Sequence, residues 1–529
     1  MVPPRLKPSK KSQASKEPVT KDDHLEVADE HEKAMGKHRA GDPAKALRFA
    51  DRALDVYTKG LAKFPRDFEL AHFKAKLELE KATDPWLIQV PGQSDVAVQL
   101  FRQSVSSHRY ALGIDPSDAD TLFNMAQAMT GLAEAITESN SIKNKNEALQ
   151  IILEALETQR RCFDVQQKLY QEVLSTTQQY AQTTDQNQSS DIPISEVMQE
   201  EEEVQIIDAV NASTLLDTVI AQTEALSLLC SFLSSATISA PHLASPTHLP
   251  EINAYKTNIE ITLQTLLDDN REILEPRLPD IFLPMAVFMG NYLELALRFG
   301  TIDRTYYEQE LSKAFSKPGI DITSKEALLA SDRALLSFNS ALSDRAGPGP
   351  SDECQFRWKL LWEERARLTS AVAGMPEIDQ HTLATTHMLR GDISLLLQVL
   401  AYPPTAFPTA ISSASDLLKA ASTYYRNASK LFAAFGPSAE EEKAICDLRG
   451  GVVTMLQQML AIQQEYARNQ ATASQDSTGL SLSILLDQVA IDDALKSVLG
   501  KGESWVRDQV SDMVSEGSIK QELFPNLLS

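Results

Sequence analysis

The feature that most constrains the fold is a set of amphipathic segments broken by tight turns near the N-terminus. Between a Gly-Asp-Pro turn at 41–43 and Pro65, apolar residues recur at spacings of three and four. Such spacing places the side chains on one face of an α-helix. Gly suits a helix end, and Pro suits the first turn of the next helix. The pattern therefore predicts helices joined by short turns.

The same helical pattern recurs along the chain, and no convincing period-two strand pattern interrupts it. Aromatic residues make up only 6% of the 529 residues, which suits helices better than sheets. We therefore expect an all-α protein. The helical regions read from the sequence are 24–80, 96–138, 147–163, 204–236, 251–270, 280–299, 303–315, 325–342, 353–373, 378–390, 392–401, 411–435, 438–468, 481–499 and 502–516.

The first amphipathic segment resembles a tetratricopeptide repeat (TPR). Its small, aromatic and proline positions match those of the repeat, and PAKALRFADRAL, which contains Ala46, resembles the start of a TPR second helix. The two alignments differ in register, which indicates a lengthened second helix. The matching residues are Gly41, Ala53, Tyr57, Gly60 and Pro65.

A second segment carries the same resemblance. Ser104, Ala111 and Pro116 match the end of one repeat, and Ala126 matches the small position of the following first helix. In such repeats, small residues let antiparallel helices approach closely, and proline stops the second helix. The match covers about 130 residues near the N-terminus.

As a whole, the chain resembles a divergent, fungal-type TPR-like protein. The resemblance implies a right-handed superhelix of antiparallel helix pairs with disordered linkers, and a concave groove that binds partner proteins. It does not identify the partner. The candidate inner positions Lys33, Lys37, Asn124 and Gln127 do not form a recognisable carboxylate clamp.

Polar segments suggest how the chain is organised. We expect the helical repeats to lie at 24–181 and 204–342 and to be followed by a further helical region. The complete division is a disordered basic tail at 1–23, TPR-like repeats at 24–181, an acidic low-complexity linker at 182–203, helical repeats at 204–342, a linker at 343–352, a C-terminal helical region at 353–516 and a tail at 517–529.

The formal net charge of −23 opposes direct binding of nucleic acid and favours basic partners. The acidic run Glu200, Glu201, Glu202 and Glu203 could contact the basic tail of a partner. The alternative is that this run is a solvated linker and that the charge only maintains solubility.

Localisation signals are few. The first residues include no apolar stretch, and the most apolar segment, Ile281 to Met289, is short and contains Pro284. The four cysteines are far apart and form no C-x-x-C pair, which indicates reduced thiols. We expect a cytoplasmic or nuclear protein that does not bind membranes.

The sequence contains no motif for catalysis or cofactor binding. His24, His31 and His38 are seven residues apart, a spacing too wide on a helix for two of them to bind one metal ion, so we expect a polar helix face. We predict no cofactor, no metal and no enzymatic activity. The oligomeric state is left open.

Two functions fit these features. The first is a non-enzymatic scaffold or adaptor that binds other proteins in a TPR-like groove. The second is an acidic assembly chaperone for a basic client, such as a ribosomal or nuclear protein. A third possible function is that of an enzyme with an unrecognised helical active site, but no motif in the sequence supports it.

Overall fold

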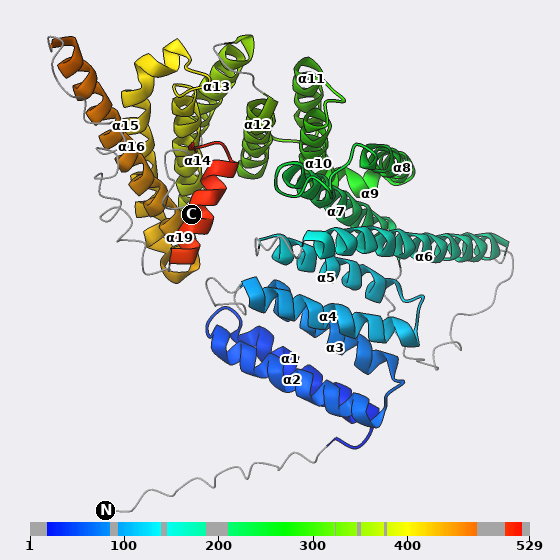
Figure 1. Cartoon of the computed structure of the whole chain (residues 1–529). Helices are drawn as coiled ribbons and strands as arrows, with labels where there is room; N and C mark the ends of the chain where they lie inside the picture. The colour runs from blue at the N-terminus through cyan, green and yellow to red at the C-terminus, as the bar shows by residue number, and fades with distance from the viewer. Residues whose placement is uncertain are drawn as a thin grey trace, which may run out of the picture. The chain divides into compact units, whose positions relative to one another are not determined.

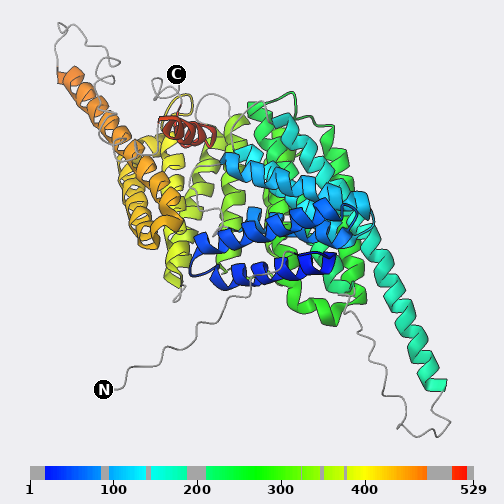
Figure 2. The same cartoon turned by 90° about the horizontal axis from the view of Figure 1, so that it is seen from below.

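The structure is a computed structural model, and it describes residues 18–84, 94–138, 145–186, 210–322, 324–345, 351–374, 378–472 and 503–520. Across these ranges every regular element is a helix, and none is a strand (Figures 1 and 2). The all-α fold class predicted from the sequence is therefore confirmed.

The chain divides into two compact units, which are described separately. Unit 1 comprises residues 1–229 and 258–273, and unit 2 comprises residues 230–257 and 274–529. The helices α7 (Ala212–Ser239) and α8 (His248–Asp269) each contribute to both units. The chain passes from one unit to the other inside these two helices and again between Ile273 and Leu274.

In unit 1, helices that follow one another in the chain pack as antiparallel pairs: α1 with α2, α3 with α4, and α5 with α6. The pairs also contact each other through α2 and α3 and through α4 and α5, so the unit is a stack of helical hairpins (Figure 1). The bounds are α1 (Lys21–His38), α2 (Pro43–Lys63), α3 (Phe68–Thr83), α4 (Ser94–Ile114), α5 (Ala119–Glu138) and α6 (Lys145–Gln186).

Aspartates start several of these helices. The Asp42 side chain accepts a hydrogen bond from the backbone N–H of Lys45, with Pro43 in the first turn of α2. Asp118 likewise accepts from the N–H of Thr121, at 2.7 Å. These bonds satisfy N–H groups that have no partner inside the helix, so they fix where the helices begin.

Unit 2 also consists of helices packed against their neighbours in the chain. Helix α10 packs against α11 and α12, and α14, α15 and α16 pack in succession. The bounds are α9 (Arg271–Leu274), η2 (Glu275–Arg277), α10 (Leu278–Arg298), α11 (Arg304–Phe315), α12 (Lys325–Arg345), α13 (Asp352–Gly374), α14 (Gln380–Val399), α15 (Pro408–Phe432), η3 (Ala433–Ala439), α16 (Glu440–Thr472) and α19 (Glu503–Ser515).

Helix α14 corrects a prediction from the sequence, which placed a break near Gly391. The helix is continuous because this glycine marks a close approach and not a helix end. A Cβ on Gly391 would lie only 2.7 Å from the ring of Tyr425 in α15. The next residue, Asp392, accepts a hydrogen bond from the Tyr425 hydroxyl at 2.6 Å. Packing between the helices therefore overrides the low helix propensity of glycine.

The Asp392 carboxylate also holds the C-terminal helix of unit 2 through Arg449 of α16. The Arg449 guanidinium donates to Asp392, and its Nη2 donates to both carboxylate oxygens of Glu516 at 3.1 Å. Glu516 follows the last residue of α19. Because Arg449 is only 9% exposed, loss of either carboxylate would leave a buried charge poorly compensated.

Other element boundaries also differ from the sequence prediction. Helix α1 begins at Lys21, inside the predicted tail. Helix α6 continues to Gln186, which is 23 residues beyond the predicted helix end at 163 and inside the predicted linker. The helix predicted from 204 is described only from Ala212, and the one predicted at 481–499 lies outside the described residues.

Two helical segments of the described chain are long and apolar enough to cross a membrane by length and composition alone. They are Ala212–Ser239 and Arg271–Arg298, each with a mean hydropathy of 1.3. Inside the protein, 61% and 50% of the respective apolar windows are buried. Core helices of soluble proteins meet the same criterion, so this is weak evidence for a membrane span.

Close packing between α4 and α5 can be tested at Gly131. A Cβ there would lie 2.5 Å from the Phe101 ring, so we expect Gly131→Ala to lower the free energy of unfolding by about 1–3 kcal/mol. Gly113 lies in α4, where an added Cβ would meet nothing within 4 Å, and Gly113→Ala should stabilise the helix by about 0.5–1 kcal/mol. Urea unfolding of both variants measures the difference. Equal effects would contradict the close approach.

Candidate partner-binding surface

The second helix of each pair in unit 1 carries small residues seven positions apart. Both members of every such pair are completely buried, with an exposed fraction of 0%. Side chains this small bring helix axes close together, so they set the spacing of the stack. The residues are Ala46 and Ala53 in α2, Ser104 and Ala111 in α4, and Ala148 and Ala155 in α6.

Tyr57 and Gly60 of α2 complete the packing of the first hairpin. The Tyr57 side chain is 2% exposed, and its hydroxyl donates a hydrogen bond to the Glu32 carboxylate at 2.5 Å. Burial raises the pKa of both groups. A Cβ on Gly60 would lie 3.1 Å from Leu70 of α3, so this glycine allows the next helix to approach.

The residues predicted to pack the repeats fall into two groups. Ala46, Ala53, Tyr57, Gly60, Ala111 and Ala126 are buried between helices. Gly41, Pro65 and Pro116 are exposed in the turns after α1, α2 and α4. Nothing lies within 4 Å of a Cβ placed on Gly41, so this residue serves the turn and does not pack a helix.

The histidines at seven-residue spacing face α2 and do not form an exposed polar face, as the sequence had suggested. His24 is 2% exposed, and the rings of His31 and His38 lie 6.1 and 5.7 Å from the ring of Phe49. Among the described residues, no group of three or more His, Cys, Asp or Glu side chains could hold a metal ion.

His108 of α4 occupies a buried position between Ser104 and Ala111. Its Nδ1 donates to the Ser104 backbone carbonyl at 2.9 Å, and the side chain is completely buried. Burial lowers the pKa of His108 to about 4. The imidazole is therefore neutral in the folded protein at pH 7.

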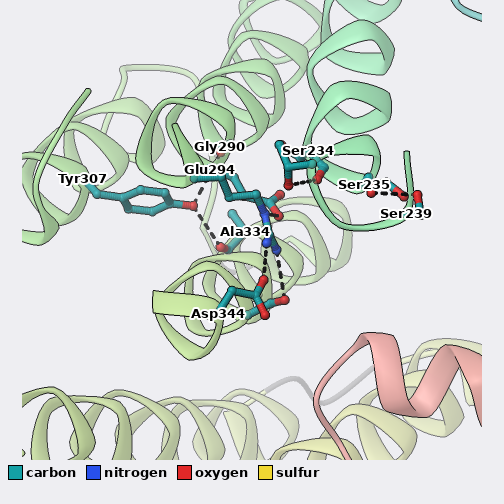
Figure 3. Close-up of polar contacts among 11 residues, drawn as sticks. Ser234, Ser235, Ser239, Gly290, Glu294, Tyr307, Ala334 and Asp344 are labelled. Atoms are coloured by element: carbon teal, nitrogen blue, oxygen red, sulfur yellow. Dashed lines mark hydrogen bonds and ion pairs between the residues drawn. The ribbon is translucent and has the colours of Figure 1, made fainter. Parts of the chain in front are cut away.

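Unit 2 contains buried carboxylates, which are common at active sites. In the cluster of Figure 3, the Arg298 guanidinium joins Glu294 of its own helix to Asp344 and Ser340 of α12. Burial raises the pKa of Glu294. The Tyr307 hydroxyl donates towards the Gly290 and Ala334 carbonyls nearby (Figure 3). These contacts join α10, α11 and α12, which is a structural role.

A second buried carboxylate lies between α12 and α13. Asp332 is completely buried, and Arg367 contacts both Asp332 and Glu364. Burial and the neighbouring Glu364 raise the pKa of Asp332, whereas the positive charge of Arg367 lowers it. Arg367 therefore links two helices through a carboxyl pair.

The cysteines carry no reactive site. All four are buried, and none forms a disulfide. Burial raises the pKa of Cys162 and of Cys446 to about 12, which disfavours the nucleophilic thiolate.

The face of α6 that contacts α7 and α8 is the candidate partner-binding surface of unit 1. The Thr218 hydroxyl of α7 donates to Gln166 at 2.7 Å, and the Tyr170 hydroxyl donates to Asn270, just after α8, at 2.9 Å. The same face continues with three apolar residues that are 37–40% exposed. We call Leu169, Val173 and Leu174 the α6 apolar face.

The α6 apolar face lies on the second half of the longest described helix, which extends beyond α5 (Figure 2). Exposed Leu and Val side chains grouped on one helix face lose favourable burial, and such groups are frequent at protein interfaces. No single residue in the sequence reveals this surface, because it depends on where the neighbouring helices end.

The polar positions considered for a carboxylate clamp do not converge. Lys33 is exposed and pairs with Asp29 of its own helix at 2.5 Å. Lys37 is also exposed on α1, whereas Asn124 and Gln127 are half-buried on α5. The acidic run Glu200–Glu203 lies outside the described residues.

Comparison with known proteins gives limited information. The chain matches no family model. Over 157 residues it is 31% identical to the Schizosaccharomyces pombe protein named "UPF0656 protein C926.02", and the match covers 29% of this chain and 34% of that protein. The matched part thus spans about a third of the length of this relative, whose name states no activity or partner.

Among solved structures, the chain is similar to a "circular tandem repeat protein with novel repeat topology and enhanced subunit contact surfaces". The identity is 12%, and the alignment covers 96% of this chain and 98% of the other. The TM-score is 0.27, too low to define a shared fold.

The buried imidazole of His108 predicts acid sensitivity. Between pH of about 6.5 and 4, the unfolded chain binds the proton that folded His108 rejects, so stability falls as pH decreases. The loss should reach roughly 3 kcal/mol near pH 4. We expect His108→Leu to remove this part of the pH dependence in urea unfolding.

The control for this experiment is His242→Leu, because His242 is exposed. It should leave the acid dependence unchanged. If wild type and His108→Leu lost stability in parallel between pH 7 and 4, the assignment would be incorrect.

Proposed function

We propose that this protein is a non-enzymatic scaffold or adaptor that binds other proteins through its stacked, TPR-like helix pairs. The observation that carries this proposal is the α6 apolar face, formed by Leu169, Val173 and Leu174. A helix or an extended peptide with apolar side chains would bury this face. We regard the hairpins of unit 1 as divergent TPRs, a view supported by the buried small residues at seven-residue spacing.

The experiment is affinity purification of the tagged full-length chain from its native cells, followed by cross-linking mass spectrometry. We expect a stoichiometric partner that cross-links to Lys168, which is exposed beside the α6 apolar face. The double variant Leu169→Glu/Val173→Glu should reduce recovery of that partner at least about tenfold, because charged groups would enter an apolar interface.

The matched control is Gln167→Glu/Gln171→Glu, which adds the same charges at exposed polar positions of the same helix. It should retain the partner. Both double variants should show the wild-type helical circular dichroism, because all four positions are exposed. Unchanged recovery with Leu169→Glu/Val173→Glu would show that the α6 apolar face is not the binding surface.

A second candidate function, an acidic assembly chaperone for a basic client, is favoured by the net charge of −23 and by an acidic side of α1. Asp22, Glu26, Asp29 and Glu30 are all exposed on this helix. Such a surface would mask client charge and attract the client over a distance.

This candidate predicts salt-sensitive binding of a basic client. Raising salt from about 0.1 to 1 M shortens the Debye length from about 10 to 3 Å and should weaken the complex strongly. Changing Glu200–Glu203 to Gln should also weaken the complex. Calorimetry with the purified client measures the affinity in both cases. Binding indifferent to both changes would exclude the chaperone function.

A further inference from the structure

A second exposed feature, in unit 2, differs in chemistry from the α6 apolar face. It begins on α13, where Trp358, Trp362 and Arg365 follow one helix face at spacings of four and three. The two indole rings stack with centroids 5.7 Å apart, and the Arg365 guanidinium lies 4.3 Å above the Trp362 ring. Trp362 is 45% exposed, which is unusual for so large an aromatic side chain.

A similar arrangement forms where α14 meets α15. The Arg390 guanidinium lies 4.2 Å above the ring of Tyr424, and its Nη2 donates to the Tyr424 hydroxyl at 2.8 Å. The His387 ring also stacks on the ring of Tyr424, with the two centroids 6.1 Å apart. We call Trp362, Arg365, Arg390 and Tyr424 the arginine–aromatic patch.

The two halves of this patch lie on helices that pack against each other, since α13 contacts α14 and α14 contacts α15. Burial lowers the pKa of Arg365, and so does repulsion from the positive charge of Arg390. The neighbouring Tyr424 has the opposite effect and raises the pKa of Arg365. Burial and the same Arg390 charge lower the pKa of His387. The electrostatic interactions thus place Arg365, Arg390 and Tyr424 in one environment on unit 2.

Neither arginine of the patch is neutralised within the described part of the chain. No carboxylate forms an ion pair with Arg365 or Arg390, and the buried Nε of Arg390 has no hydrogen-bond acceptor. The nearby acids pair elsewhere: Glu363 with Lys359, Asp416 with Lys419, and Glu364 with Arg367.

Three other arginines of unit 2, in contrast to Arg365 and Arg390, lie beside acidic side chains. Arg298, Arg367 and Arg449 each lie within 4 Å of two carboxylates. In a chain with 73 acidic residues and a net charge of −23, Arg365 and Arg390 lie over aromatic rings and, among the described residues, pair with no carboxylate. Like charges held together cost free energy, which a bound anion would offset.

We propose that the arginine–aromatic patch binds an acidic peptide segment of a partner protein. Its carboxylates would pair with Arg365 and Arg390, whose planar forks match carboxylate geometry. An apolar or aromatic side chain of the peptide would pack on Trp362, since Trp, Tyr and Arg dominate binding energy at interfaces. This inference rests on the proposed protein-binding function and adds the chemistry of one partner segment.

Charge also selects a peptide over RNA. Arginine and tryptophan can stack on nucleobases, but the acidic field of the whole chain opposes a long polyanion. A short peptide with a few carboxylates needs only the local charge of the patch.

The test is fluorescence anisotropy with the full-length chain and three labelled probes: a peptide alternating Glu and Phe, the same peptide with Gln for Glu, and a single-stranded RNA of matched length. We expect binding of the Glu peptide alone. Arg365→Gln/Arg390→Gln should weaken it at least about tenfold, and Trp362→Ala about three- to tenfold.

The matched control is Arg426→Gln, which removes one exposed positive charge from α15 close to Tyr424 in sequence. It should change the Kd less than about twofold, as expected for an exposed charge outside the site. Because Arg390 is partly buried, circular dichroism checks each fold; if the double variant unfolds, Trp362→Ala and the single Arg365→Gln provide the test.

Three results would overturn the proposal: no binding of the Glu peptide, equal binding of the Gln peptide, or preferential binding of RNA. Leu169→Glu/Val173→Glu should leave Glu-peptide binding intact, so failure of the patch and failure of the α6 apolar face are distinguishable.

Discussion

Close approach of neighbouring helices at small residues is the interaction on which the rest of this structure depends. In unit 1 it is provided by completely buried Ala and Ser residues such as Ala46, Ser104 and Ala148. In unit 2, Gly290 and Gly391 play the same part, because a Cβ on either would lie within 3.1 Å of a side chain of the facing helix. Larger side chains at these sites would separate the helices and remove many small dispersion contacts at once.

Polar groups buried by this packing serve the contacts between helices. Arg298, Arg367 and Arg449 each pair with two acidic side chains from different elements, so these ion pairs stabilise one arrangement of helices. The two exposed surfaces differ from these buried ion pairs. The α6 apolar face and the arginine–aromatic patch both leave groups on the surface that a partner would cover, which is why function is assigned to surfaces and not to a cavity.

The sequence predicted the helical fold and most helices within a few residues, because periodicity and Asp or Pro caps are local signals. It failed at Gly391, where a contact with Tyr425 from another helix decides the conformation. It could not find either surface, since the exposure of Leu169 and the contact of Arg390 with Tyr424 depend on which distant residues lie nearby.

The central claim, that the chain works by binding proteins on its helical surfaces, is tested most directly by hydrogen–deuterium exchange with and without the purified partner. We predict that amide exchange in residues 167–176 of α6 slows when the partner is added, because its apolar face becomes covered. A bound partner that left exchange in this segment unchanged would contradict the account.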